Sequence, residues 1–271
     1  MNARVAVAAV LGLSALTGLA GQLRAYPGGT PRFTTNANTY CAGCHSSVGA
    51  DQLRDQPADI ASSMTVENRH YASIQGGQER YGKLSEDDRK KLLDTVKAMD
   101  ANSKVEIAAS ATTVKALGTL TVTVTTHGGA GPVVGVMLTD NDLRFESSPV
   151  QTEGFLITKA PDVTGPDGKP QTAFLDGRYK DLQKNINYVN VQGVKSDPST
   201  NTYPTCKVVY TLQAPSKPGT YTVTAAFLYG TENASPIGRQ ETPDGRLLPA
   251  GGGGGASGRI QFAKTLTITV S

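Results

Sequence analysis

The sequence predicts a small all-α domain over residues 26–102 and an all-β sandwich over residues 103–271, both after an N-terminal leader. Three observations predict this fold class. Apolar residues recur at helical spacing before residue 102, and they alternate with a period of two after residue 103. The length of 271 residues is also enough for two ordinary domains.

Residues 1–25 have the pattern of a secretory signal peptide. Arg4 supplies a positive charge, an uncharged run of small and apolar residues follows from Val5 to Gly21, and Ala25 offers a small residue near the cleavage region. The run of about 17 residues is at the short limit for a membrane-spanning helix, so an uncleaved anchor is the alternative. We therefore expect a periplasmic or secreted protein.

The predicted helical domain closes with a helix that begins near Leu84. Ser85 can cap the first amide groups, and the three acidic residues that follow it complement the positive end of the helix dipole. Leu92, Val96 and Met99 recur at helical spacing. These three side chains are therefore expected to form one buried stripe.

The predicted sandwich rests on four runs in which apolar and polar residues alternate. They are Leu120–Thr125, Val208–Leu212, Tyr221–Phe227 and Leu266–Val270. Threonine on the outward positions suits sheets with one solvated face. Clusters of Gly and Pro separate the runs, which predicts an antiparallel sandwich of about seven to nine short strands.

Composition and charge exclude several classes of function. The net charge of +3 is too small for a nucleic-acid-binding protein. Three His and three Cys are too few for an enzyme with several His-ligated metal ions. The sequence also has no recognisable nucleophile–base set or pair of carboxylates, so it does not predict an enzyme.

One motif carries specific chemistry: Cys41-Ala42-Gly43-Cys44-His45 is a C-x-x-C-H sequence. Two thiols at this spacing can add to the two vinyl groups of one haem, and the adjacent imidazole can then bind the iron. A thioredoxin-like dithiol would need alternating strands and helices around it, and a zinc site would need a second ligand pair. A plain disulfide leaves His45 unexplained. The motif therefore predicts one covalent haem c.

Residues 26–102 resemble a monohaem class I cytochrome c. The resemblance rests on Tyr40 before the motif, the motif itself, Ile74-Gln75-Gly76-Gly77, and the helix start at Leu84–Asp88. It implies an electron carrier in which Cys41 and Cys44 are haem thioethers and His45 is the proximal ligand. The C-terminal part is similar in architecture to immunoglobulin-like sandwiches, a likeness that implies no chemistry.

The distal haem ligand is where the sequence departs from class I cytochromes. These usually supply a Met shortly before the closing helix, and residues 78–83 contain none. His70, the remaining imidazole of this segment, is the expected sixth ligand, and Met64 is the alternative. An open or Tyr81-ligated iron is the third arrangement. Two imidazoles favour electron transfer, whereas an open position admits a small ligand.

The expected function is that of an exported monohaem c-type cytochrome. It would exchange electrons with a redox partner protein, and the sandwich would serve docking, assembly or self-association. The alternatives are a haem sensor with an open distal site and a surface interaction module with an accessory haem. His127 is expected in a loop at a strand end, and Cys206 is either a half-buried thiol or part of an intermolecular disulfide.

Overall fold

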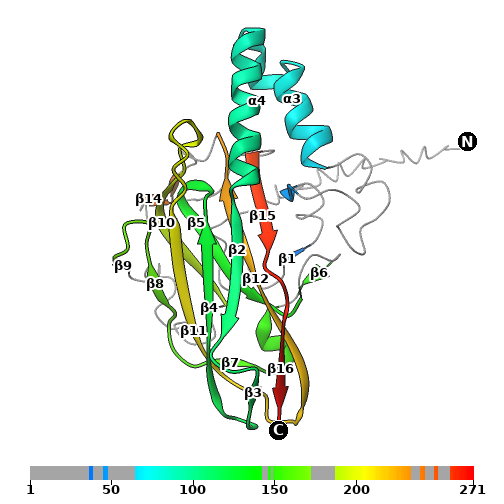
Figure 1. Cartoon of the computed structure of the whole chain (residues 1–271), viewed down its shortest axis with the longest axis vertical. Helices are drawn as coiled ribbons and strands as arrows, with labels where there is room; N and C mark the ends of the chain where they lie inside the picture. Colours follow the sequence, from blue (N-terminus) through cyan, green and yellow to red (C-terminus); the bar gives the residue numbers. More distant parts are fainter. Residues whose placement is uncertain are drawn as a thin grey trace, which may run out of the picture.

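The structure is a computed structural model that describes residues 37–38, 45–47, 65–141, 146–147, 149–171, 187–232, 239–241, 247–249 and 257–271. The expected signal peptide, Cys41, Cys44 and Met64 lie outside these residues. Most of the described chain is strand, and one long helix stands at an end of the sheets (Figure 1).

The strands form two six-stranded sheets. The first has the order β2 (Lys104–Ala109), β4 (Thr119–His127), β11 (Thr205–Gln213), β8 (Asp162–Thr164) and β9 (Pro170–Gln171), with β7 (Leu156–Ile157) also paired to β11. The second has the order β10 (Tyr188–Lys195), β5 (Ala130–Thr139), β12 (Gly219–Gly230), β16 (Leu266–Val270) and β3 (Thr113–Val114), with β15 (Gly258–Phe262) also paired to β12.

Alternation of side chains explains why these segments are strands. In β4 the apolar positions Leu120, Val122 and Val124 are buried, while the threonines between them are partly exposed. β11 lies antiparallel to β4, with Val208 opposite Val124 and Leu212 opposite Leu120. One face of the pair is therefore part of the main apolar core, which contains residues of both sheets.

Smaller elements complete the described chain. Two-stranded ribbons join β1 (Ala37–Asn38) to β6 (Glu146–Ser147) and β13 (Arg239–Glu241) to β14 (Leu247–Pro249). Short 3-10 helices cover Val150–Glu153 (η4) and Pro198–Thr200 (η6).

The helical segment begins with the π-helix η2 (Glu67–Tyr71), continues as α3 (Ala72–Gln75) and the 3-10 helix η3 (Glu79–Lys83), and ends with α4 (Glu86–Ala101). The predicted cap of α4 is confirmed, because the Ser85 side chain accepts a hydrogen bond from the Asp88 amide at 3.1 Å. Val96 and Met99 are buried on one face of α4, as expected, and Leu92 is half-buried.

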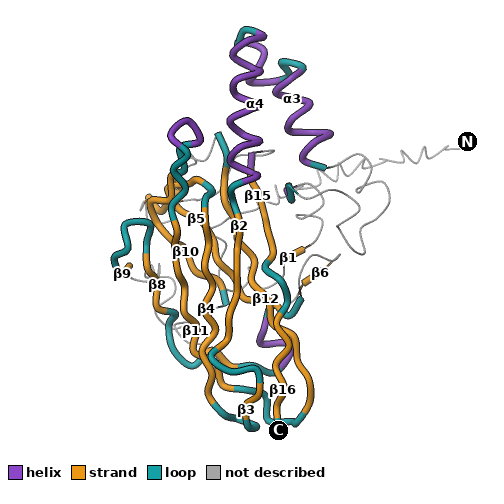
Figure 2. Tube along the Cα trace, in the orientation of Figure 1, coloured by secondary structure: helices purple, strands orange, loops and turns teal. Residues whose placement is uncertain are grey.

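Ser103 fixes the C-terminal end of α4 to the sheets. Its hydroxyl donates to the Met99 carbonyl at 2.7 Å and accepts from the Gly129 amide at 2.8 Å, in the turn between β4 and β5. The helices consequently stand at one end of the sheets, and the C-terminus of the chain lies at the opposite end (Figure 2). In the described ranges, no helix is long and apolar enough to cross a membrane.

The expected combination of an all-α cytochrome c-like domain with an all-β immunoglobulin-like sandwich is wrong. The described residues form a predominantly β structure with one long helix, and the resemblance of residues 26–102 to class I cytochromes c is wrong with it. The reason is visible in the packing. Among the described residues, the buried apolar cluster of the helices consists of Ile74, Tyr81 and Val96. His70 and Asp100 are also buried, and they bind Glu232 and Arg259, which follow β12 in the sequence. The buried polar side chains of the helical segment therefore find their partners at the sheets, not in a helical core of their own.

Candidate functional site

His45 lies against strand β15. Its Nδ1 is 2.8 Å from the Gly258 carbonyl oxygen, across 213 residues of sequence. A carbonyl oxygen can only accept, so Nδ1 carries the proton and Nε2 keeps its lone pair. Within the described part of the chain, no hydrogen bond to Nε2 is present. This tautomer is the one in which Nε2 can bind a metal ion.

The surroundings of His45 favour the neutral imidazole. Burial lowers the pKa of His45, and the hydrogen bond to Gly258 opposes this effect. The nearby positive charges of Arg259 and Arg69 lower the pKa further. A neutral ring is the form that ligates iron, so the electrostatics and the tautomer agree.

A buried ion pair lies next to His45. Arg259, on β15, donates from Nε to Asp100 Oδ1 at 2.9 Å and from Nη2 to Asp100 Oδ2 at 3.0 Å. The side chains of Arg259 and Asp100 are 0% and 4% exposed. Burial alone would lower the pKa of Arg259, but the Asp100 carboxylate outweighs it and raises that pKa. The pair joins α4 to β15 through two parallel hydrogen bonds.

Two tyrosines also bind the Asp100 carboxylate. The Tyr71 hydroxyl donates to Oδ2 at 2.7 Å, and the Tyr229 hydroxyl donates to Oδ1 at 3.3 Å. Burial and the Asp100 charge raise the pKa of both phenols, so both stay protonated as donors. Gln261 then donates to Tyr229 at 3.0 Å and to Ser47, two residues after His45, at 3.2 Å. The hydrogen-bond network therefore extends from Asp100 to Ser47, two residues after His45.

His70 is buried in the same network, and both of its ring nitrogens have protein partners. Nδ1 accepts from Arg259 Nη2 at 2.8 Å, since a guanidinium can only donate. Nε2 is 3.1 Å from Glu232 Oε1 and 3.0 Å from the Tyr81 hydroxyl. Nε2 therefore carries the proton. The lone pair of His70 Nδ1 therefore points to Arg259.

Glu232 is the acceptor at the far side of His70. It accepts from Tyr81 at 2.6 Å and from Thr231 at 2.7 Å, besides His70. Burial alone would raise the pKa of Glu232, but the hydrogen bonds from His70, Tyr81 and Thr231 outweigh it and lower the pKa to about 2. Glu232 is therefore ionised at neutral pH. Burial and the bond to Glu232 raise the pKa of Tyr81, which stays protonated and so is not a tyrosinate ligand in this arrangement.

The remaining residues considered in the sequence lie away from this cluster. His127 is at the end of β4, where its Nδ1 lies 3.0 Å from the Thr205 hydroxyl. The Cys206 thiol is buried in the core, and burial raises its pKa to about 11. An intermolecular disulfide at Cys206 would require the strand to leave the core. Met99 is buried on α4, as expected of a core side chain.

Sequence reasoning missed Arg259, Asp100 and Glu232. Asp100 lies near the end of α4, and Glu232 and Arg259 stand before and after the glycine-rich stretch of residues 233–257. No local pattern marks these three residues. The one signal was that Asp100 directly follows Met99 of the predicted buried stripe, where a charge requires a buried partner.

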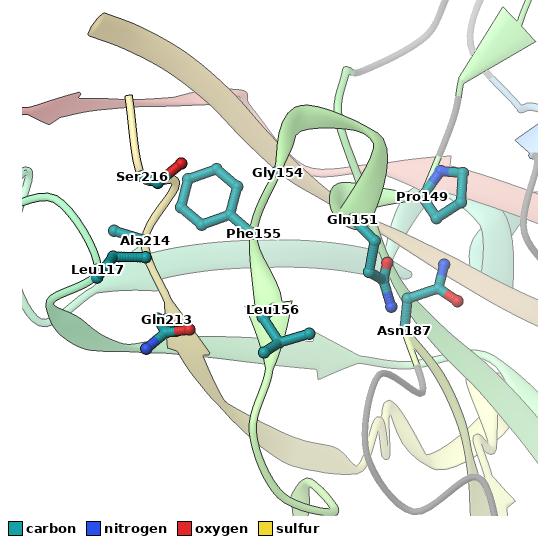
Figure 3. A pocket seen from close by; sticks show the side chains of 10 residues that line it. All are labelled: Leu117, Pro149, Gln151, Gly154, Phe155, Leu156, Asn187, Gln213, Ala214 and Ser216. Atoms are coloured by element: carbon teal, nitrogen blue, oxygen red, sulfur yellow. The ribbon is translucent and has the colours of Figure 1, made fainter. Parts of the chain in front are cut away.

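A pocket of about 610 Å³ lies at the side of the sheets, lined by η4, β7 and the end of β11 (Figure 3). Leu117 and Leu156 line it and are 56% and 42% exposed. Its lining residues include no His, Cys, Asp or Glu. The described lining of the pocket therefore offers no carboxylate, imidazole or thiol. Nor do the described residues contain a cluster of three or more such side chains arranged for a metal ion.

No protein-family model matches the chain, and no curated protein sequence matches it. Three solved structures show how distant the structural likenesses are. The macrocyclisation catalyst AvmM of alchivemycin A biosynthesis has a TM-score of 0.30 and 13% identity, covering 62% of this chain and 89% of its own. The PapD-like domain 7 of human CEP192 has a TM-score of 0.24 and 11% identity, covering 63% and 87%. The collagen-binding domain of a Staphylococcus aureus adhesin has a TM-score of 0.23 and 8% identity, covering 59% and 95%. At such scores none supports an argument about function.

Proposed function

We propose that this chain is an exported c-type cytochrome that carries one covalent haem and exchanges electrons with a redox partner protein. Cys41 and Cys44 would hold the haem as thioethers, and His45 Nε2 would be the axial ligand. The observation that carries the proposal is the His45 geometry. A C-x-x-C-H histidine with its Nδ1 proton on the Gly258 carbonyl at 2.8 Å has the tautomer that an iron ligand needs.

Each residue of the site has a separate task in this proposal. The haem supplies a one-electron centre when bound. Gly258 orients the imidazole and fixes its tautomer, and burial keeps the ring neutral. Export fits the same chemistry, since residues 1–25 have the pattern of a secretory signal. Docking of the sheets to a partner or to a second copy remains a prediction.

The geometry supports a second task for the sheets. Because the acceptor for His45 belongs to β15, the sheets complete the site of the axial ligand. A truncated chain of residues 26–102 would lack that carbonyl and also Arg259. We therefore expect it to lose the spectrum of the full chain or to fail to fold. A truncated chain that keeps the full spectrum would argue that the sheets serve docking alone.

The test is haem attachment to the full chain expressed with cytochrome c maturation machinery. We expect one haem that survives acid–acetone extraction and is quantified as its pyridine haemochrome. Cys41→Ala with Cys44→Ala should abolish it. Cys206→Ala is the matched control, because this thiol lies in the core and should leave attachment unchanged. Retention of covalent haem in the double variant would overturn the proposal.

A second candidate function is binding of a small ligand at an open sixth position. The observation that favours it is His70, whose two ring nitrogens are both engaged by Arg259, Glu232 and Tyr81. With His70 held in this way, the ferrous protein would be high-spin and would bind carbon monoxide. A low-spin spectrum that His70→Ala converts to high-spin would favour electron transfer with His70 as ligand. A Met–iron charge-transfer band would assign that role to Met64.

A further inference from the structure

The Gly258 carbonyl is shared between two donors. It accepts from His45 Nδ1 at 2.8 Å and from Nη1 of Arg259 at 3.1 Å. A carbonyl oxygen has two lone pairs, so both bonds can form at once. The second donor draws electron density from the oxygen, and the bond from His45 is weaker than it would be with an unshared carbonyl.

The Arg259 side chain is held in this position by burial and by hydrogen bonds. Its side chain is 0% exposed, and its three nitrogens donate to the Asp100 carboxylate, to His70 Nδ1 and to the Gly258 carbonyl. The Asp100 carboxylate is itself held by the hydroxyls of Tyr71 and Tyr229. The guanidinium is therefore a fixed positive charge close to His45, in a region where water does not screen it.

We propose that Arg259 is a positioning residue for His45: by fixing and sharing the Gly258 carbonyl it sets how strongly the imidazole can donate electrons through Nε2. The proposal rests on the proposed function, because the acceptor of those electrons is the haem iron. An axial imidazole with a stronger Nδ1–H bond is a stronger donor, which favours the ferric state and lowers the midpoint potential. Arg259 would thus keep the midpoint potential of the haem iron higher than it would be without the guanidinium.

The ion pair allows the sign of this effect to be tested. Arg259→Met removes the competing donor and leaves the Asp100 charge unpaired, and both changes favour ferric iron. We expect the midpoint potential to fall. Asp100→Asn keeps the guanidinium and removes its counter-charge, so the potential should rise. The double variant Asp100→Asn with Arg259→Met should lie between the two. A merely structural role for the pair would not move the potential in opposite directions.

The potentials are measured by spectroelectrochemistry on the haem-loaded full chain. Lys159→Gln is the matched control, because Lys159 forms an ion pair of 2.8 Å with Asp162 in which both side chains are more than half exposed. It should leave the potential unchanged. Equal potentials in wild type, Arg259→Met and Asp100→Asn, or shifts of one sign in both variants, would overturn the proposal.

A second measurement does not need haem. In NMR spectra of the ¹⁵N-labelled full chain without haem, the resonance of the His45 Nδ1 proton should shift downfield in Arg259→Met. The reason is that its hydrogen bond to the Gly258 carbonyl becomes stronger. Arg259→Lys, which keeps the charge but loses the planar fork, supplies the same comparison if Arg259→Met fails to fold. An unchanged Nδ1 proton in the folded variants would refute the positioning role. Absence of covalent haem in the wild type would overturn the proposed function alone.

Discussion

The Asp100–Arg259 ion pair should be a large contributor to the stability of the helical segment on the sheets. Asp100→Asn keeps the shape of the side chain and removes its charge. The guanidinium of Arg259, which is 0% exposed, then loses the charge of the Asp100 carboxylate. Removing one partner of a buried ion pair costs about 3–5 kcal/mol, so we expect the free energy of unfolding to fall by that amount.

The assay is urea unfolding of the full chain at neutral pH, followed by circular dichroism. Asp162→Asn is the control, since its pair with Lys159 is exposed and its loss should change the free energy of unfolding by less than about 1 kcal/mol. A double-mutant cycle with Arg259→Met should show a coupling of about 2–3 kcal/mol, because the second change removes the charge that the first left unpaired. Additive effects, or an Asp100→Asn cost below about 1 kcal/mol, would refute the reasoning.

Three further predictions concern stability. The pKa of Glu232 is lowered to about 2 from an ordinary value of 4.5, so its stabilisation is present above about pH 4.5 and is lost as pH falls toward 2. Glu232→Gln should remove up to about 2 kcal/mol of the difference in unfolding free energy between pH 6 and pH 3, measured by urea unfolding, because pH 3 still lies above the folded-state pKa; an unchanged difference would contradict the prediction. Gly129→Ala should lower the free energy of unfolding by about 1–3 kcal/mol, because the φ of Gly129 is +71° and the new Cβ would lie 2.7 Å from Tyr229 Cβ. The melting temperature should fall accordingly, and an unchanged melting temperature would count against this close approach. Tyr210→Phe should cost about 1 kcal/mol, since the buried hydroxyl shares its single proton between the Val136 and Asn187 carbonyls, each 3.1 Å away; equal urea midpoints would show that this hydrogen bond contributes nothing.

The sequence was informative wherever structure depends on near neighbours. The alternating runs that begin at Leu120 and Val208 lie in β4 and β11, and those at Tyr221 and Leu266 lie in β12 and β16. The Ser85 cap and the start of α4 were also readable. These features follow from side-chain periods of two or 3.6 residues and from capping within one turn, which are properties of a few consecutive residues.

Extrapolation from those local signals produced the wrong fold class. A helix start, a C-x-x-C-H motif and a few apolar positions indicated a helical domain. However, the described residues 65–85 form short π, α and 3-10 helices, and the apolar cluster that they make with α4 is small. Local periodicity reports that a helix has a buried face. It does not report whether helices or sheets cover that face.

The sequence alone predicts haem attachment at Cys41, Cys44 and His45, because the spacing of two thiols and an imidazole is a property of five consecutive residues. Only the tertiary structure decided what surrounds His45. Its acceptor is 213 residues away, and the ion pair beside it joins residues 159 apart. Such contacts form because β15 pairs with β12 and brings Gly258 and Arg259 to the end of the sheets where α4 stands. Their partners are therefore set by the pairing of strands across the whole chain, which no local pattern records.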